Sequence, residues 1–163
     1  VVLAADSVLI PSAGLLVTGI VLLVIDLART GGTKAAKDAN LSDAMWIGLC
    51  QGISVFPGLS RSGLTISAGL MSGFSRTFAV KYSYILSIPA IIGSLIMELG
   101  QFGSPAMTVG LGFAYVLGMI VSGVTAFFVI RYCLKLVHKG RFRVFAIYCF
   151  VIGLVTLIIN HML

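Results

Sequence analysis

The stretch FPGLSRSGLTIS, residues 56–67, interrupts an otherwise oily sequence with turn-forming residues, hydroxyl groups and one arginine. Pro57 and Gly58 disfavour a continuous helix, so the chain is expected to turn there. Helical patterns flank the turn at residues 41–54, with Ser42 or Asp43 as the expected N-cap, and at residues 64–74. Each arm is too short to cross a bilayer, which takes ~20 apolar residues. This predicts a re-entrant hairpin over about residues 41–74, where irregular backbone must be buried in protein or line a wet cavity.

The composition around this stretch is typical of a membrane protein. Of the 163 residues, 59% are hydrophobic and 10% are charged, whereas soluble domains carry about 25% charged residues. Apolar runs long enough to span a bilayer occupy residues 8–27, 78–99, 107–130 and 145–159. We therefore expect an all-α membrane protein, with four transmembrane helices and one re-entrant hairpin in a single polytopic domain over residues 1–163.

The distribution of basic residues predicts the orientation of these helices. Ten of the 11 basic residues lie in segments next to the spans, namely Arg29, Lys34, Lys37, Arg76, Lys81, Arg131, Lys135, Lys139, Arg141 and Arg143. If the hairpin returns to the side it entered from, all ten face one compartment, which the positive-inside rule makes the cytoplasm. Residues 100–105 and both termini then face outside. Short basic loops between apolar runs also argue against a nucleic-acid partner, despite the net charge of +6.

The eleventh basic residue, Arg61, lies at the predicted tip of the hairpin. A charge at membrane depth costs at least ~2.5–3.5 kcal/mol and usually marks a functional site, although Arg61 could instead pair with carbonyls of the broken helices. Ser60, Ser62 and Thr65 add hydroxyl groups, and Gly63 allows close approach where the second arm exposes free N–H groups. An arginine fork beside a helix N-terminus favours a phosphate or pyrophosphate ligand.

The run from Pro57 to Thr65, PGLSRSGLT, with Gln51-Gly52 before it, resembles the PGxSRSGxT motif of bacterial undecaprenyl pyrophosphate phosphatases, also called bacitracin-resistance proteins. The similarity covers essentially the whole chain and corresponds to the C-terminal part of that family. It implies a fold of two inverted repeats, each with a re-entrant hairpin, whose tips meet in a cavity open to the periplasmic side of the inner membrane. It also implies hydrolysis of undecaprenyl pyrophosphate to undecaprenyl phosphate, which recycles the cell-wall lipid carrier.

The resemblance implies roles for individual residues. Arg61, Ser60 and Ser62 are the expected catalytic residues, and the expected substrate-binding residues are Gln51, Pro57, Gly58, Gly63 and Thr65. For Gln51 a purely structural hydrogen bond between helices is an equal alternative. A divalent cation, Mg²⁺ or Ca²⁺, is implied as a cofactor, but no ligand for it can be identified in this sequence.

The sequence also departs from the family pattern. The family's first repeat has an ExxxE-type acidic motif and a serine-rich turn that ends in histidine. Here Glu98 is the only glutamate, and neither His138 nor His161 follows such a turn. The chain is therefore expected to be the second half of the enzyme, and its activity in isolation is left open.

Two other functional classes remain as alternatives. Inverted repeats with broken helices also occur in transporters, so the chain could bind or flip a lipid phosphate without hydrolysing it. It could also be a non-catalytic half-length subunit. The expected partners are a polyprenyl pyrophosphate lipid, the membrane, and either the missing N-terminal repeat or a second copy of the chain. The strong charge bias disfavours a homodimer of opposite orientations.

Overall fold

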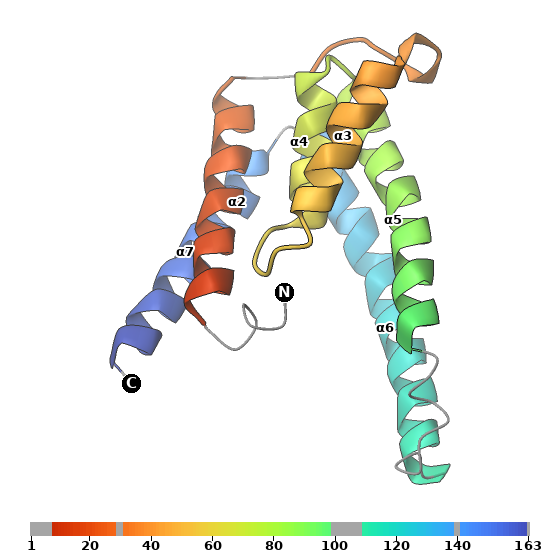
Figure 1. The fold of residues 1–163 in the computed structure, drawn as a ribbon, viewed down its shortest axis with the longest axis vertical. Coiled ribbons are helices and arrows are strands. Elements are labelled where there is room, and N and C mark those ends of the chain that lie inside the picture. Colours follow the sequence, from red (N-terminus) through yellow and green to blue (C-terminus); the bar gives the residue numbers. More distant parts are fainter. Residues whose placement is uncertain (1–7, 29–30, 99–108, 139–140, 163) are drawn as a thin grey trace. The chain divides into compact units, whose positions relative to one another are not determined.

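The computed structural model describes residues 8–28, 31–98, 109–138 and 141–162, and these residues are almost entirely helical (Figure 1). The elements are α2 (Leu9–Leu27), the short 3-10 helix η1 (Ala36–Asp38), α3 (Leu41–Ile53), α4 (Arg61–Met71), α5 (Arg76–Glu98), α6 (Val109–His138) and α7 (Phe142–Met162). Within the described ranges the only β pairing is an isolated bridge between Lys34 and Phe74. The predicted all-α class is confirmed.

Four of these helices are long and apolar enough to cross a membrane. Their candidate spans are Leu9–Leu27, Arg76–Met97, Gly110–Tyr132 and Phe142–Asn160. Each lies within a few residues of a predicted span, so the expectation of four transmembrane helices is confirmed. Helix α5 continues through Pro89. That α3 and α4 form a re-entrant hairpin within the bilayer stays a prediction.

The chain divides into two compact units. One consists of residues 1–83 and 136–163, and the other of residues 84–135. The first unit holds α2, α3, α4, the start of α5 and all of α7, and it includes the predicted tip. The expectation of a single polytopic domain stays a prediction.

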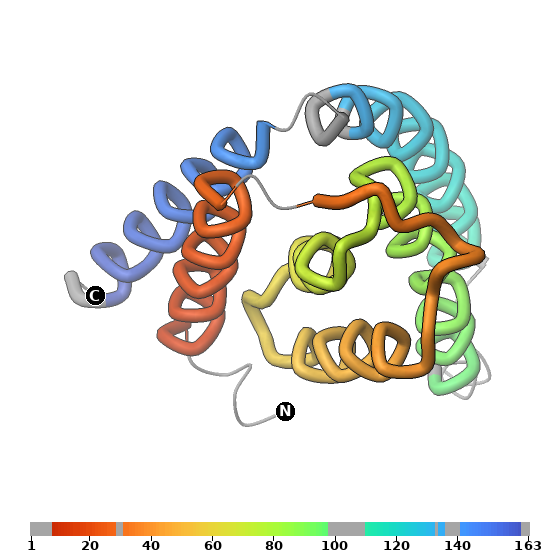
Figure 2. Tube along the Cα trace, turned by 90° about the horizontal axis from the view of Figure 1, so that it is seen from above, coloured from red at the N-terminus to blue at the C-terminus, as the bar shows by residue number. Residues whose placement is uncertain are grey.

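Helices α2 and α7 lie side by side in the first unit (Figures 1 and 2). Glycines allow their close approach: a Cβ added at Gly153 would lie 3.0 Å from the Leu16 side chain, and one at Gly19 would lie 3.3 Å from Phe150. Near one end of the pair, Arg143 Nε lies 3.7 Å from Asp26 Oδ2. Helix α4 also contacts α2, so α4 packs on a helix that α7 already holds in place.

Helices α3 and α4 form a helical hairpin, in which α3 begins at the expected residue 41 but has a different N-cap, and α4 begins earlier than expected. The N-cap of α3 is Asn40, whose side chain accepts from the Asp43 N–H while the Asp43 carboxylate accepts from the Asn40 N–H. The expected caps, Ser42 and Asp43, are therefore wrong, because this reciprocal capping box places Asp43 at the third helical position. Helix α4 begins at Arg61, earlier than the expected residue 64, because Ser60 supplies its N-cap.

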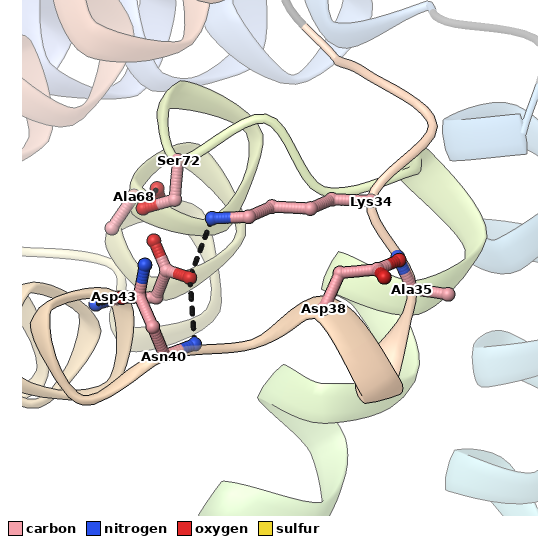
Figure 3. A network of polar contacts seen from close by, with 7 residues as sticks. All are labelled: Lys34, Ala35, Asp38, Asn40, Asp43, Ala68 and Ser72. Carbon is pink, nitrogen blue, oxygen red and sulfur yellow. Dashed lines mark hydrogen bonds and ion pairs between the residues drawn. The ribbon is translucent and has the colours of Figure 1, made fainter.

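A strap of residues 31–40 contacts the start of α3 and the residues after α4, a region called here the base of the hairpin. Figure 3 shows the polar contacts that the strap makes there. Its backbone pairs with the residues that follow α4, since Gly32 N donates to Phe74 O at 3.1 Å and Ser75 N donates to Lys34 O at 3.0 Å. The Lys34 side chain then reaches the start of α3, where Nζ lies 2.6 Å from Asp43 Oδ2. One residue thus ties both arms together.

The ion pair with Lys34 shifts the pKa of Asp43. The hydrogen bond from Lys34 lowers the pKa of Asp43, and the backbone hydrogen bond from Asn40 lowers it further. Because both bonds favour the carboxylate, Asp43 stabilises the fold above its unfolded-state pKa of ~3.9. That contribution is lost as the pH falls through the lower folded-state pKa.

Replacing Lys34 by methionine is expected to lower the thermal unfolding midpoint of the detergent-solubilised protein near neutral pH. The substitution leaves the buried Asp43 carboxylate without its cationic partner, and the deficit is expected to shrink as the pH falls below ~4 and Asp43 is protonated. Lys37→Met is the matched control, because Lys37 is exposed on the same strap. An equal drop in the thermal unfolding midpoint of both variants at every pH would show that the Lys34–Asp43 ion pair does not stabilise the fold.

Candidate functional site

The turn between α3 and α4 is compact and depends on one glycine. Residues 54–60 connect the arms, and Leu59 N donates to Phe56 O at 3.2 Å. Gly58 has a φ of +85°, a left-handed conformation that glycine adopts without steric cost. The expected turn at Pro57 and Gly58 is where the structure has it.

The backbone of this turn is in close contact with the backbone of α2. A Cβ added at Gly14 of α2 would lie 2.5 Å from the carbonyl oxygen of Pro57. A Cβ added at Gly58 would in turn overlap the carbonyl oxygen of Pro11, inside the 3.0 Å that real Cβ atoms essentially never enter. The two backbones therefore meet with no room for a side chain on either glycine.

The hydroxyl of Thr18, one turn further along α2, completes this contact. Its Oγ1 accepts from Ser60 N at 3.0 Å and lies 3.0 Å from Gly14 O and 3.4 Å from Gly58 O. Ser60 Oγ in turn accepts from Gly63 N at 3.1 Å and caps α4. The first turn of α4 is thus anchored to a membrane-spanning helix through backbone and hydroxyl groups.

Arg61 follows the cap as the first residue of α4, and its side chain is exposed. Within the described part of the chain, its guanidinium makes no hydrogen bond or ion pair, and no acceptor takes the N–H groups of Arg61 and Ser62. Such unpartnered N–H groups at a helix start, with the positive end of the helix dipole, favour an anion. The tip therefore presents a cation and two backbone donors in one place.

The hydroxyl groups expected at this site divide into two kinds. Ser60 Oγ and Ser62 Oγ are exposed and 3.5 Å apart. Ser60 Oγ accepts from Gly63 N, and its own proton can be donated either to Ser62 Oγ or to a ligand. Thr65 is buried instead, with Oγ1 2.9 Å from Arg61 O and 2.6 Å from Ser83 Oγ on α5. The structure brings Ser60, Arg61 and Ser62 together at the surface and uses the Thr65 hydroxyl to join α4 to α5.

Gln51 lies on α3, near the end of the first arm. Its Oε1 atom is buried without a hydrogen-bond partner in the described residues. A buried acceptor left unpaired is costly, which makes Gln51 a candidate to receive a donor that these residues do not supply. Its role in substrate binding stays a prediction.

Sequence reasoning missed the residues that hold the tip in place. Gly14 and Thr18 of α2 and Ser83 of α5 carry none of the charge that drew attention to Arg61. The spacing of Gly14 and Thr18, four residues apart, was an available signal, because small residues at that interval allow helices in lipid to approach closely.

The donor groups in the described residues do not fit a protein-held divalent cation. No three His, Cys, Asp or Glu side chains come together in the described ranges, whereas Mg²⁺ and Ca²⁺ prefer carboxylate and carbonyl oxygens. The described charge at the tip is the cationic Arg61, which would repel such an ion unless anionic phosphate accompanied it.

Comparison with known proteins gives a consistent result. The family described as "Bacitracin resistance protein BacA" matches residues 3–155. A protein of Desulforapulum autotrophicum named "Undecaprenyl-diphosphatase" is 42% identical over 94% of this chain and 54% of its own length. Proteins of the same name from Halothermothrix orenii and Methanobrevibacter smithii are 36% and 34% identical, over 89% and 94% of this chain and 56% and 54% of their own lengths. The chain spans about half the length of the curated relatives it matches.

Proposed function

The chain belongs to the bacitracin resistance protein BacA family, and we propose that it supplies the pyrophosphate-binding half of a membrane enzyme that hydrolyses undecaprenyl pyrophosphate to undecaprenyl phosphate and phosphate. The observation that carries this proposal is the tip itself. At the capped N-terminus of α4, Arg61 and Ser62 lie exposed beside the half-buried Ser60, and the guanidinium and two N–H groups have no partner within the described residues.

Each of these groups has a defined task toward a pyrophosphate. The planar guanidinium of Arg61 can make two parallel hydrogen bonds to phosphate oxygens. The N–H groups of Arg61 and Ser62 add two donors that need no rearrangement during the reaction. The Ser60 hydroxyl can donate one further hydrogen bond. Donors already in place stabilise negative charge that develops on the phosphoryl oxygens as the anhydride bond breaks. In this proposal the described residues hold and polarise the substrate, and the activated water or nucleophile comes from outside them.

The surroundings of the tip favour an amphiphilic substrate over free pyrophosphate. Ile53, Val55 and Phe56, just before the tip, are exposed apolar side chains. A ligand with a charged head and an isoprenoid tail would satisfy Arg61 and cover this apolar surface at once. This supports the lipid pyrophosphate that the relatives' name denotes.

Two further features of the proposal rest on family membership. A divalent cation, Mg²⁺ or Ca²⁺, would neutralise charge on the pyrophosphate when bound. The acidic and histidine motifs that this sequence lacks would come from an N-terminal repeat, because a second copy of the chain would lack them as well. Bacitracin resistance and cell-wall precursor recycling would follow from the same activity.

Phosphate release from a C55 isoprenyl pyrophosphate by the purified full-length gene product tests the proposed reaction. Release that depends on added Mg²⁺ or Ca²⁺ supports the whole proposal, and release without a cation requirement removes the cofactor from it. Lipid binding or flipping without release would instead favour the transporter or the non-catalytic subunit. A shorter-chain isoprenyl pyrophosphate assayed in parallel reports how much the tail contributes.

The candidate spans and the family make this a multi-pass membrane protein, and its orientation is the finer part of the proposal. We propose the bacterial inner membrane, with the basic loops in the cytoplasm and the tip in a cavity that opens outside. The support is the charge bias, since Lys34, Lys37 and the start of α3 lie at the base of the hairpin.

Cysteine labelling in cells is expected to report this orientation. In a background without native cysteines, Ser104→Cys is expected to react with an impermeant thiol reagent from outside, and Ala36→Cys only after permeabilisation. Ala36 is exposed on the strap, so its accessibility depends on the compartment, whereas residue 104 lies outside the described ranges. The opposite labelling pattern would invert the topology.

A further inference from the structure

The hydroxyl of Thr18 belongs to a membrane-spanning helix, yet it bonds to the backbone of the motif tip. Thr18 is 1% exposed. Its Oγ1 accepts the N–H of Ser60 at 3.0 Å, and its own proton is shared between Gly14 O at 3.0 Å and Gly58 O at 3.4 Å. The bond accepted from Ser60 N, and the longer of the two contacts of its proton, therefore join α2 to the tip.

The methyl group of Thr18 is also in contact with the tip. A Cβ added at Gly63 would lie 3.4 Å from Thr18 Cγ2, so the methyl group packs against the first turn of α4. Thr18 therefore fixes this turn by a hydrogen bond at Ser60 and by van der Waals contact at Gly63. Serine would retain the first of these contacts and valine the second.

The position of Ser60 determines where the anion-binding groups lie. Ser60 is the N-cap of α4, and its Oγ and its carbonyl bond to the N–H groups of Gly63 and Leu64. The free N–H groups of Arg61 and Ser62 and the root of the arginine side chain follow directly from it. A shift of Ser60 would displace all of them together.

We propose that Thr18 is a positioning residue for the reaction, acting through the Ser60 backbone rather than by touching substrate. The inference rests on the proposed function of the tip. Without the hydroxyl, the Ser60 N–H loses its acceptor in a part-buried position, and the tip gains freedom to leave the productive geometry. A displacement of ~1 Å at a reacting group can cost ~10²-fold in rate.

Three variants of the full-length gene product test this proposal. Thr18→Val keeps the shape but removes the hydroxyl, and Thr18→Ser keeps the hydroxyl. Thr156→Val is the matched control, because Thr156 is a half-buried α7 threonine that donates to Ile152 O within its own helix. For each variant we would measure kcat, KM, the thermal unfolding midpoint, and amide hydrogen exchange at residues 59–63.

Thr18→Val is expected to lower kcat by ~10–100-fold and to speed exchange of the Ser60 amide, which loses its acceptor, by ~5-fold or more, with Thr18→Ser restoring most of both. Unchanged exchange in Thr18→Val would overturn the anchoring role. Two other outcomes would overturn the proposal and reduce Thr18 to a packing residue. One is faster exchange with an unchanged kcat per folded molecule. The other is a loss of kcat that a lower unfolding midpoint fully explains. A wild-type protein that releases no phosphate would instead refute the proposed function, while the exchange data would still decide the anchoring.

Discussion

Arg61→Ala in the full-length gene product is expected to lower phosphate release from a C55 isoprenyl pyrophosphate by ~10³-fold or more, in line with the loss of an arginine that stabilises a phosphoryl transition state. The reason is local. Arg61 is exposed, and no other described residue engages its guanidinium, so its removal leaves the fold intact. Steady-state phosphate release, normalised to folded protein from size-exclusion chromatography, measures the effect.

Arg61→Lys separates charge from geometry. A lysine retains the positive charge but not the planar fork, so it is expected to recover only a small part of the lost rate. Arg143→Ala serves as the control, because Arg143 is another exposed arginine and its 3.7 Å pair with Asp26 lies on α7 and α2. Near-normal turnover in Arg61→Ala would remove Arg61 from the mechanism, and full activity in Arg61→Lys would show that a point charge suffices.

The location of the tip was predictable because its residue types are rare in apolar sequence. Pro57 and Gly58 disfavour helix, and Arg61 is the one basic residue outside the segments that flank the spans. Both signals are local, so they can be recognised in the sequence without knowledge of the tertiary structure. The arms of the hairpin and the four spans followed from the same local reasoning and were confirmed to within a few residues.

The N-cap of α3 and the start of α4 were harder to predict, because capping depends on hydrogen bonds formed in the folded chain and not on residue type alone. Ser42 and Asp43 are both good N-cap residues, but the structure uses Asn40 with Asp43 as its partner. The shift has a consequence at the base of the hairpin, because it leaves one Asp43 oxygen, Oδ2, to bind both Asn40 N and Lys34 Nζ.

The support of the tip could not be predicted from the motif. Thr18 precedes Ser60 by 42 residues, and its sequence neighbourhood is that of an ordinary apolar span. Only the packing of α2 against α4 reveals that its hydroxyl is an acceptor for the motif backbone. The same holds for Ser83, whose Oγ lies 2.6 Å from Thr65 Oγ1 in the buried contact between α4 and α5. The role of Thr65 in substrate binding stays a prediction.

Gly58→Ala is expected to destabilise the protein by on the order of 3 kcal/mol, from a left-handed φ and from overlap with α2. The φ of +85° is unfavourable for alanine, and the new Cβ would overlap the carbonyl oxygen of Pro11. That oxygen belongs to the α2 backbone and cannot move aside as a flexible side chain could. We expect a thermal midpoint lower by roughly 10 °C and little phosphate release from the molecules that remain folded.

Two other glycines divide this effect into its causes. Gly73 has nearly the same φ, +84°, but a Cβ there would meet only Lys34 Cδ at 4.0 Å, so Gly73→Ala reports the backbone strain alone. Gly14 lies within α2, where alanine would gain ~1 kcal/mol of helix propensity, so any loss in Gly14→Ala reports the 2.5 Å approach to Pro57 O. Gly93→Ala, in open space on α5, is expected to be neutral or stabilising. If Gly14→Ala behaves like Gly93→Ala, α2 does not hold the tip closely, and the anchoring of the motif by Gly14 and Thr18 fails with it.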